Sequence, residues 1–400
     1  MSHLEWIKQQ SNAITPEVIG WRQHLHAHPE LSFQEFETAK FIARVLREMG
    51  LEPKEGIGGT GIVALIEGQN PLSKSIALRA DMDALPIEEK NDIDYKSKNI
   101  GVMHACGHDV HTASLLGTAK ILFSAKDRFE GTVKLLFQPA EEKNPGGASL
   151  MIKDGALTNP TPDCIIGQHV FPLLPVGKIG FKSGQYMASA DEIYLRVIGK
   201  GGHAAMPELI VDPVLITSHI IVALQQVVSR NANPRNPTVL SFGKIISEGA
   251  TNVVPNEVNI AGTFRTMDDK WRKEGLIKIN KIAQSIAEGM GGKCEVEISH
   301  GYPYLNNDPQ LTQRIRKKAE EYMGTENVVD IDMTMSSEDF AYYSKVISAS
   351  LYRLGTRNES KGITNYVHTP NFNIDEDALS FSTGLMAWMA LNELSFLEMK

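Results

Sequence analysis

Residues 132–142 read TVKLLFQPAEE, a short apolar run followed at once by two adjacent carboxylates. An apolar run of this length, bounded by turn residues, is typical of a strand buried within a sheet. Further runs of this kind occur at residues 61–66, 75–80 and 163–167. Helical spacing of apolar residues occurs at residues 36–49, 110–123 and 148–153. This alternation of strand and helix predicts an α/β fold whose sheet is covered by helices on both faces.

The pattern changes near residue 190. Strands are expected at residues 191–198, 238–246, 257–266 and 293–300, with helices at residues 213–229 and 270–288. The order β-α-β-β-α-β is that of the split-βαβ, ferredoxin-like motif. We therefore predict that residues 188–302 form an α+β domain inserted between residues 1–187 and 303–400, which together form the main domain.

Composition and charge narrow the class of protein. Apolar residues make up 42% of the 400 residues and charged residues 22%, as in ordinary globular proteins. The net charge of -8 does not favour a nucleic-acid partner. No stretch approaches the roughly 20 apolar residues of a membrane helix, and the first residues lack the pattern of a signal peptide. Three widely spaced cysteines cannot build a disulfide framework, so we expect a cytoplasmic protein.

Side chains that can bind a metal follow three of the predicted strands. Asp81 and Asp83 follow the run at 75–80, Glu141 and Glu142 follow TVKLLFQPA, and His169 follows the run at 163–167. In open α/β sheets, ligands bind beyond the carboxyl ends of the strands. Any one of these residues alone would be an ordinary cap, turn or surface residue. Together they predict that three strands deliver acids and an imidazole to one edge of the sheet.

A further concentration lies in HACGHDVHT, residues 104–112, just before a predicted helix. It holds His104, Cys106, His108 and His111. Neutral imidazole, thiolate and carboxylate are the donors that zinc and neighbouring divalent metals prefer. A bound metal can lower the pKa of water from about 15.7 to about 7. The pattern therefore indicates metal-assisted hydrolysis.

The adjacent pair Glu141 and Glu142 suits a division of labour between a general base and a metal ligand. The base has to be a carboxylate that is not itself occupied by the metal. The spacing of the two residues does not decide which of them has which role.

Five segments together resemble one known family. They are RADMDALPIEE, HACGHDVHT, QPAEE, GKGGHAAMPE and HTPNF. In this order they resemble the metallopeptidase family of aminoacylases and carboxypeptidases, and best its amidohydrolase branch of hippurate hydrolases, N-acyl-amino-acid amidohydrolases and auxin-conjugate hydrolases. The resemblance runs from about residue 21 to residue 374. It implies a mixed-sheet, three-layer, zinc-peptidase-like catalytic domain, with the insert as a lid and dimerisation domain.

The resemblance also implies a site with two divalent metal ions, either zinc, manganese, nickel or cobalt. The implied ligands are Cys106, His108, Glu142, His169 and His368. Glu141 takes the role of general base. Asp81 corresponds to an aspartate that orients a ligating histidine. The neighbours His104, Asp109 and His111 are expected to support the ligands through hydrogen bonds, or, in the case of Asp109, to cap the helix.

In the insert, the resemblance gives roles to three residues. His203, in GKGGHAAMPE, is implied to reach the active site of a partner subunit and stabilise the oxyanion. Asn252 and Arg265 are implied to hold the carboxylate of the substrate. A homodimer through the insert follows from this arrangement. The segment Ser337-Glu338-Asp339 matches a late motif of the family near the site entrance, and the sequence assigns it no role.

The predicted activity is metal-dependent cleavage of a small-molecule N-acyl-amino acid, N-acetyl or hippurate-like, to a carboxylate and a free amino acid. A small dipeptide or N-acetyl-diaminopimelate is an alternative substrate for the same two-metal mechanism. A thiol hydrolase with Cys106 as nucleophile is a second alternative, and a chelator would not inhibit it. A non-catalytic binding module on the same fold is a third, and it would not require Glu141.

Overall fold

The computed structural model describes residues 2–398, which divide into two compact units. The first unit runs to Gly184 and resumes over Asn306–Asp332 and from Asp339 onward. The second unit comprises Gln185–Leu305 and Met333–Glu338. The predicted insert, residues 188–302, lies within the second unit.

The short segment Met333–Glu338 belongs to the second unit although it follows the insert by thirty residues in the chain. It is held by backbone hydrogen bonds, from Ala188 N–H to Ser336 O (2.9 Å) and from Thr334 N–H to Tyr186 O (2.9 Å). A non-periodic segment of six residues carries no signal of such long-range pairing, so sequence patterns do not assign it.

The first unit is built on a mixed sheet with the strand order β1-β2-β4-β3-β5-β16-β6-β15. The strands are β1 (Lys54–Ile57), β2 (Gly61–Glu67), β3 (Ser75–Asp81), β4 (Thr132–Gln138), β5 (Cys164–Pro175), β6 (Ile179–Phe181), β15 (Val328–Asp330) and β16 (Ser348–Arg357). β3 pairs in parallel with both β4 and β5, and β5 pairs in parallel with β16. β2 pairs antiparallel with β4. Two short strands, β7 (Gly184–Met187) and β14 (Leu305–Asn307), stand where the chain passes between the units.

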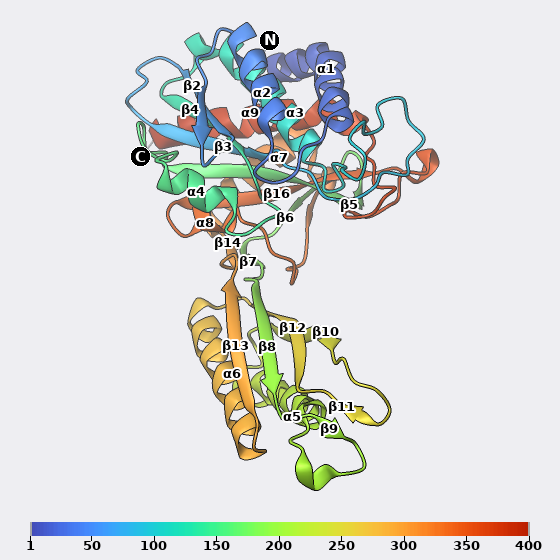
Figure 1. Ribbon diagram of the computed structural model, residues 1–400. Coiled ribbons are helices and arrows are strands. Elements are labelled where there is room, and N and C mark those ends of the chain that lie inside the picture. The colour runs from blue at the N-terminus through green and yellow to red at the C-terminus, as the bar shows by residue number, and fades with distance from the viewer. Residues whose placement is uncertain (1, 399–400) are drawn as a thin grey trace. The chain divides into compact units, whose positions relative to one another are not determined.

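Helices form a layer on each face of this sheet. They are α1 (His3–Ala27), α2 (Phe36–Glu48), α3 (His108–Ser124), α4 (Gly147–Lys153), α7 (Pro309–Met323), α8 (Ala341–Ser344) and α9 (Asp377–Glu398). Figure 1 shows α1, α2, α3 and α9 on one face, with α4 and α8 on the other. Helices on both faces of a mixed sheet confirm the predicted three-layer α/β architecture.

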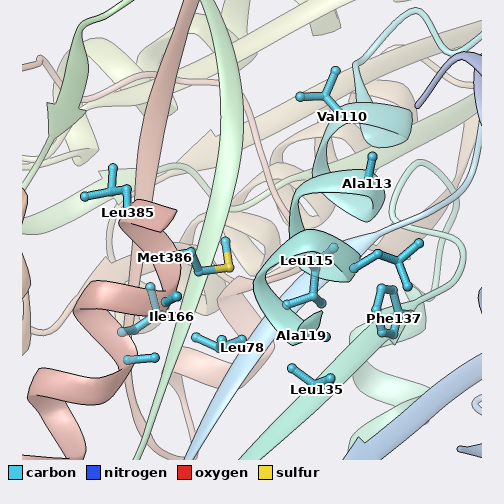
Figure 2. Packing of buried hydrophobic residues seen from close by; sticks show 14 of the residues in the cluster. Leu78, Val110, Ala113, Leu115, Ala119, Leu135, Phe137, Ile166, Leu385 and Met386 are labelled. Carbon is cyan, nitrogen blue, oxygen red and sulfur yellow. The ribbon is translucent and has the colours of Figure 1, made fainter. Parts of the chain in front are cut away.

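α3 lies at the centre of the core and packs against α1, α9 and β3. Because it has neighbours on every side, nearly all of its side chains are buried. Figure 2 shows Leu115 and Ala119 of this helix among Leu78, Leu135 and Phe137 of the sheet. A helix enclosed in this way has a rigidly placed first turn, which is the turn that carries His108.

The second unit has a four-stranded sheet of order β10-β12-β8-β13. Its elements are β8 (Asp191–Ile198), β9 (Gly202–His203), α5 (Pro213–Gln226), β10 (Thr238–Ile246), β11 (Val253–Val254), β12 (Glu257–Thr266), α6 (Asp269–Gly289) and β13 (Lys293–His300). This is the predicted β-α-β-β-α-β order. The helix expected at 213–229 ends sooner, because the chain changes to a π-helical turn over Val227–Asn231.

Within residues 2–398, no helix combines the length and the apolar character of a membrane span.

Candidate metal centre

Of three neighbouring strands in the large sheet, β3 and β4 have donor side chains at or just past their carboxyl ends, and β5 has one near its middle, just beyond its pairing with β3. β3 ends at Asp81, β4 is followed after two residues by Glu141 and Glu142, and β5 contains His169. β3 runs parallel to both of its neighbours. Because strands with a common direction end at the same edge of a sheet, these donors converge there.

Cys106 lies where two sets of donor atoms meet. Its Sγ is 3.5 Å from Nε2 of His169 and 3.3 Å from Nε2 of His368. The donor atoms of Cys106, His108 and His169 all lie within 4.8 Å of one another, and so do those of Cys106, Glu142 and His368. We call these sets the first and second donor trios. Two trios that share the sulfur of Cys106 would supply the donors for two divalent metal ions.

The loop that carries the shared cysteine is held in a tight conformation. Gly107 has a φ of 81°, and a Cβ at this position would lie 2.6 Å from a methyl group of Val170. Glycine is therefore required for both the backbone angle and the space. On the other side, the N–H of His368 donates to Ala105 O at 2.7 Å. The loop and the segment that carries His368 are thereby tied together.

Hydrogen bonds at Nδ1 orient the imidazole rings of two candidate ligands, His169 and His108. Nδ1 of His169 donates to Val170 O at 2.7 Å, and Nδ1 of His108 lies 3.1 Å from Oδ1 of Asp83. Each contact leaves Nε2 for a metal, as is common at ligating histidines. Nε2 of His108 is buried without a hydrogen-bond partner among the described residues. A buried nitrogen in this condition suits a metal ligand, because an unpaired buried polar atom is otherwise costly.

Asp83, and not Asp81, contacts the ring of His108 through a hydrogen bond. The carboxylate of Asp83 also accepts hydrogen bonds from Ser32 Oγ (2.6 Å) and from the N–H groups of Glu141 (3.1 Å) and Glu142 (3.0 Å). The nearest approach of Asp81 to His108 is 3.8 Å. The hydrogen bond that orients His108 is therefore made by Asp83, and the role that the family resemblance implies for Asp81 stays a prediction. Asp81 ends β3 and Asp83 lies two residues further on, so their spacing could not separate them.

Asp81 instead contacts His111, and both nitrogens of that ring are in use. Nδ1 of His111 lies 2.5 Å from Oδ1 of Asp81, and Val170 N–H donates to Nε2 at 2.8 Å. An imidazole that uses both nitrogens in hydrogen bonds has no lone pair left for a metal. His111 is therefore a supporting residue, as the sequence predicts.

The centre has an excess of negative charge. Burial, and then the carboxylates of Glu142, Glu141 and Asp81, raise the pKa of the Cys106 thiol well above its ordinary value. Burial alone would lower the pKa of His108, but the nearby carboxylates raise it to about 10. Divalent cations would neutralise this charge and deprotonate the thiol. A nucleophilic cysteine needs a lowered pKa, so the surroundings do not favour the thiol-hydrolase alternative.

The three residues singled out in the insert all lie in the second unit. His203, on β9, is exposed. Its pairing partner is Val253 on β11, the residue that follows Asn252. Arg265, on β12, is half-buried, and its Nη1 donates to Met335 O at 3.1 Å. His203 thus lies on β9, Asn252 lies in the turn just before β11, and Arg265 lies on a strand of the four-stranded sheet.

Two residues of the first unit have contacts that the motifs did not reveal. Arg79 and Asp339 are fully buried and form an ion pair, with Nη2 of the arginine 2.9 Å from Oδ1 of the aspartate. Arg79 belongs to the RADMD segment and Asp339 to the SED segment. A charged residue in a run that otherwise reads as a buried strand was the available signal for Arg79.

The fold and the paired donor trios define the class of metal-dependent hydrolases. The sequence model described as peptidase family M20/M25/M40 matches residues 77–392, and the chain belongs to this family. This membership confirms the resemblance seen in the sequence.

Relatives with related names cover most of the chain. The N-acyl-L-amino acid amidohydrolase of Geobacillus stearothermophilus is 44% identical over 305 residues, which cover 76% of this chain and 82% of that protein. The N-acetyl-L-cysteine deacetylase of Bacillus subtilis is 41% identical over 378 residues, 93% and 88% of the two chains. A solved structure of a dinuclear metal binding peptidase from the M20 family, from Bacillus subtilis, is 35% identical with a TM-score of 0.82, covering 96% of this chain and 99% of that one.

Proposed function

We propose that the chain is an amidohydrolase with two metal ions that cleaves N-acyl-amino acids to a carboxylate and a free amino acid. The observation that carries the proposal is the pair of donor trios joined at Cys106, with a further buried carboxylate, Glu141, beside them. The names of the two relatives, an N-acyl-L-amino acid amidohydrolase and an N-acetyl-L-cysteine deacetylase, support this substrate class.

The donor trios would each hold one divalent ion. The first trio supplies Cys106, His108 and His169, and the second supplies Cys106, Glu142 and His368. When bound, the two ions provide Lewis acidity toward the amide carbonyl and a strong nucleophile at neutral pH. Thiolate, imidazole and carboxylate donors together suit zinc, manganese, nickel and cobalt. We keep all four as candidates.

Glu141 acts as the general base in this proposal. It lies outside both trios, and its Oε2 is 4.0 Å from Nε2 of His108. From this position its carboxylate removes a proton from the attacking water and delivers it to the leaving nitrogen. Proton transfer of this kind is worth about 10²- to 10⁴-fold in rate.

His203, Asn252 and Arg265 bind the substrate in this proposal. Ala205 N–H donates to Nδ1 of His203 at 3.1 Å, so Nδ1 is an acceptor and the proton lies on Nε2. An exposed Nε2–H is the donor that an oxyanion requires. Arg265 and Asn252 hold the substrate carboxylate, which a guanidinium can bind through two hydrogen bonds.

The proposal includes a homodimer formed through the second unit, which also acts as the lid, so that His203 serves the partner's site. The second unit has exposed apolar side chains that a partner could cover. Leu215 and Val222 lie seven residues apart on α5, and Ile245 lies on β10; they are 51%, 74% and 54% exposed. β10 ends the strand order of its sheet, and an open edge strand pairs readily with another chain.

A cytoplasmic location is the last part of the proposal. Cys106, Cys164 and Cys294 are all free and buried. Free thiols without any disulfide are typical of proteins in a reducing compartment.

The reaction is tested on metal-stripped protein reloaded with zinc, manganese, nickel or cobalt. N-acetyl-, N-benzoyl- and longer N-acyl-amino acids are offered, with dipeptides and N-acetyl-diaminopimelate beside them. We expect release of a free amino acid from an N-acyl-amino acid only after metal is restored. If only dipeptides are cleaved, dipeptides replace N-acyl-amino acids as the substrate class. If no amino acid is released with any of the four metals, the proposal is overturned.

The base is tested by Glu141→Gln, with Glu142→Gln as the neighbouring control. Glu141→Gln should lower kcat by about 10²- to 10⁴-fold because proton transfer is lost, while both metals stay bound. Glu142→Gln should lose metal, since its carboxylate belongs to the second trio. Metal content is measured by elemental analysis. A Glu141→Gln protein that keeps more than a small fraction of activity would contradict the assignment.

A further inference from the structure

Asp339 is a fully buried carboxylate whose two oxygens are both engaged. Nη2 of Arg79 donates to Oδ1 at 2.9 Å. Nε2 of Gln138 donates to Oδ1 at 2.7 Å and to Oδ2 at 2.9 Å, and Ala148 N–H donates to Oδ2 at 2.9 Å. These donors come from β3, β4 and α4, so the carboxylate joins three elements at the edge of the sheet.

Arg79 extends this network toward the donor trios. Its Nη1 donates to Oδ2 of Asp81 at 2.6 Å, and its Nε donates to Oε1 of Gln138 at 2.9 Å. Asp81 in turn contacts His111. Because a guanidinium is planar and its donors are fixed relative to one another, Arg79 sets the distance between Asp81 and Asp339.

The backbone of Asp339 faces Glu141. Its N–H donates to Oε1 of Glu141 at 3.4 Å, and both residues are buried. The direction of this N–H depends on the position of Asp339, whose side-chain carboxylate is held by hydrogen bonds from Arg79, Gln138 and Ala148. Loss of the carboxylate contacts would therefore release the N–H that faces Glu141.

We propose that Asp339 is a positioning residue for Glu141: the anchored carboxylate of Asp339 fixes the backbone N–H that orients the carboxylate of the base. The inference rests on the proposed role of Glu141. Asp339 is 0% exposed and so does not touch substrate. It acts on kcat through Glu141, since a base must lie within hydrogen-bond reach of the proton that it takes.

The test compares Asp339→Ala and Asp339→Asn with the wild-type protein. Misplacing a catalytic group by a small distance costs up to about 100-fold in rate, so Asp339→Ala should lower kcat by about 10- to 100-fold with KM and metal content unchanged. Asp339→Asn should lose less activity, because its amide oxygen can still accept from Arg79. A loss of kcat together with loss of metal would overturn the inference in favour of a role in the metal centre.

Glu393→Ala is the matched control. Glu393 is 2% exposed and forms an ion pair with Arg314, at 2.7 Å, between α9 and α7. Like Asp339→Ala, Glu393→Ala removes a buried carboxylate from an ion pair with an arginine, but this pair lies away from the donor trios. The variant should therefore have a lower Tm and an unchanged kcat. If Asp339→Asn lowers kcat no more than Glu393→Ala does, Asp339 has only a structural role.

A structural measurement separates this inference from the proposed function. Crystal structures of metal-loaded wild type and Asp339→Asn should show the Glu141 carboxylate displaced in the variant. An unchanged Glu141 carboxylate would overturn the inference. Should the wild type hydrolyse no N-acyl-amino acid, the proposed function fails, and the position of Glu141 in the two crystals still decides the role of Asp339.

Discussion

At the scale of single residues, Asp83 contacts two candidate ligands and the base. It accepts hydrogen bonds from Ser32 and from the backbone of Glu141 and Glu142, and it faces Nδ1 of His108. One carboxylate thus orients a member of the first trio, a member of the second trio and the base. A single short side chain can do this because it stands just beyond β3, between the segments that follow β4 and precede α3.

We predict that Asp83→Ala lowers the affinity of the protein for metal. Loss of a group that orients ligands costs about 10- to 100-fold in metal affinity. The measurement is competition with a chelator of known affinity, for wild type and variant. Ser32→Ala is the control, because it removes one hydrogen bond to Asp83 and leaves the carboxylate in place. Equal metal affinities for Asp83→Ala and wild type would contradict the prediction.

At the scale of elements, β4 carries a buried lysine in a strand that otherwise reads as apolar. Lys134 is 1% exposed, and its Nζ donates to Ala156 O at 3.0 Å and Thr158 O at 2.6 Å. Burial, with a smaller contribution from Lys54, lowers the pKa of Lys134 to about 8. The two carbonyl groups accept two of the three hydrogen bonds that the ammonium can donate, and they bring no opposite charge.

The lowered pKa predicts a pH dependence of stability. Below about pH 8, Lys134 is protonated in both the folded and the unfolded chain, and the cost of burying the charge acts in full. Between about 8 and the ordinary value of 10.5 the folded state releases its proton first, so the unfolded state binds more protons and stability rises with pH. The slope is at most about 1.4 kcal/mol per pH unit.

Lys134→Met isolates this effect from other groups that titrate in the same range. Urea unfolding of both proteins should show the wild type gaining stability relative to Lys134→Met as the pH rises above about 8. We compare how the free energy of unfolding of each protein changes with pH, and not its absolute value. Lys134→Met also leaves two carbonyl groups unpaired, and this cost is the same at every pH. Parallel stability curves would show that the lysine keeps an ordinary pKa.

At the scale of the whole molecule, the proposed dimer predicts complementation between two inactive proteins. Glu141→Gln and His203→Ala chains are mixed after dissociation and allowed to reassociate. If His203 serves the partner's site, each mixed dimer has one site with both residues intact. Half of the dimers are then mixed, and about a quarter of the wild-type activity should return.

A histidine that serves its own chain gives a different result. Each site in a mixed dimer would then lack either Glu141 or His203, and no activity would return. The mass in solution, measured by light scattering, is the control that dimers have formed. Dimers without recovered activity would contradict the assignment of His203 to the partner's site.

Much of the fold could be predicted from the chain. The strands expected at 238–246, 257–266 and 293–300 have these same bounds in the structure, because strand and turn residues alternate clearly there. The sequence does not predict the last two thirds of β5, residues 168–175, since the pattern of a buried strand is lost after the first residues. The convergence of acids and imidazoles at one sheet edge was predictable because parallel strands share a direction.

Local sequence by itself determined the elements of the insert, four strands of the large sheet, the α/β class, the family and the residue types gathered near the strand ends, since these depend on periodicity and on motifs read along the chain. Only the tertiary structure decided which partners those residues have. Asp83 contacts His108, and Asp81 contacts His111. Asp339 accepts a hydrogen bond from Arg79, 260 residues away in the chain. The physical reason is that a hydrogen bond needs a distance and a direction between two side chains, and spacing along the chain specifies neither for residues on different elements.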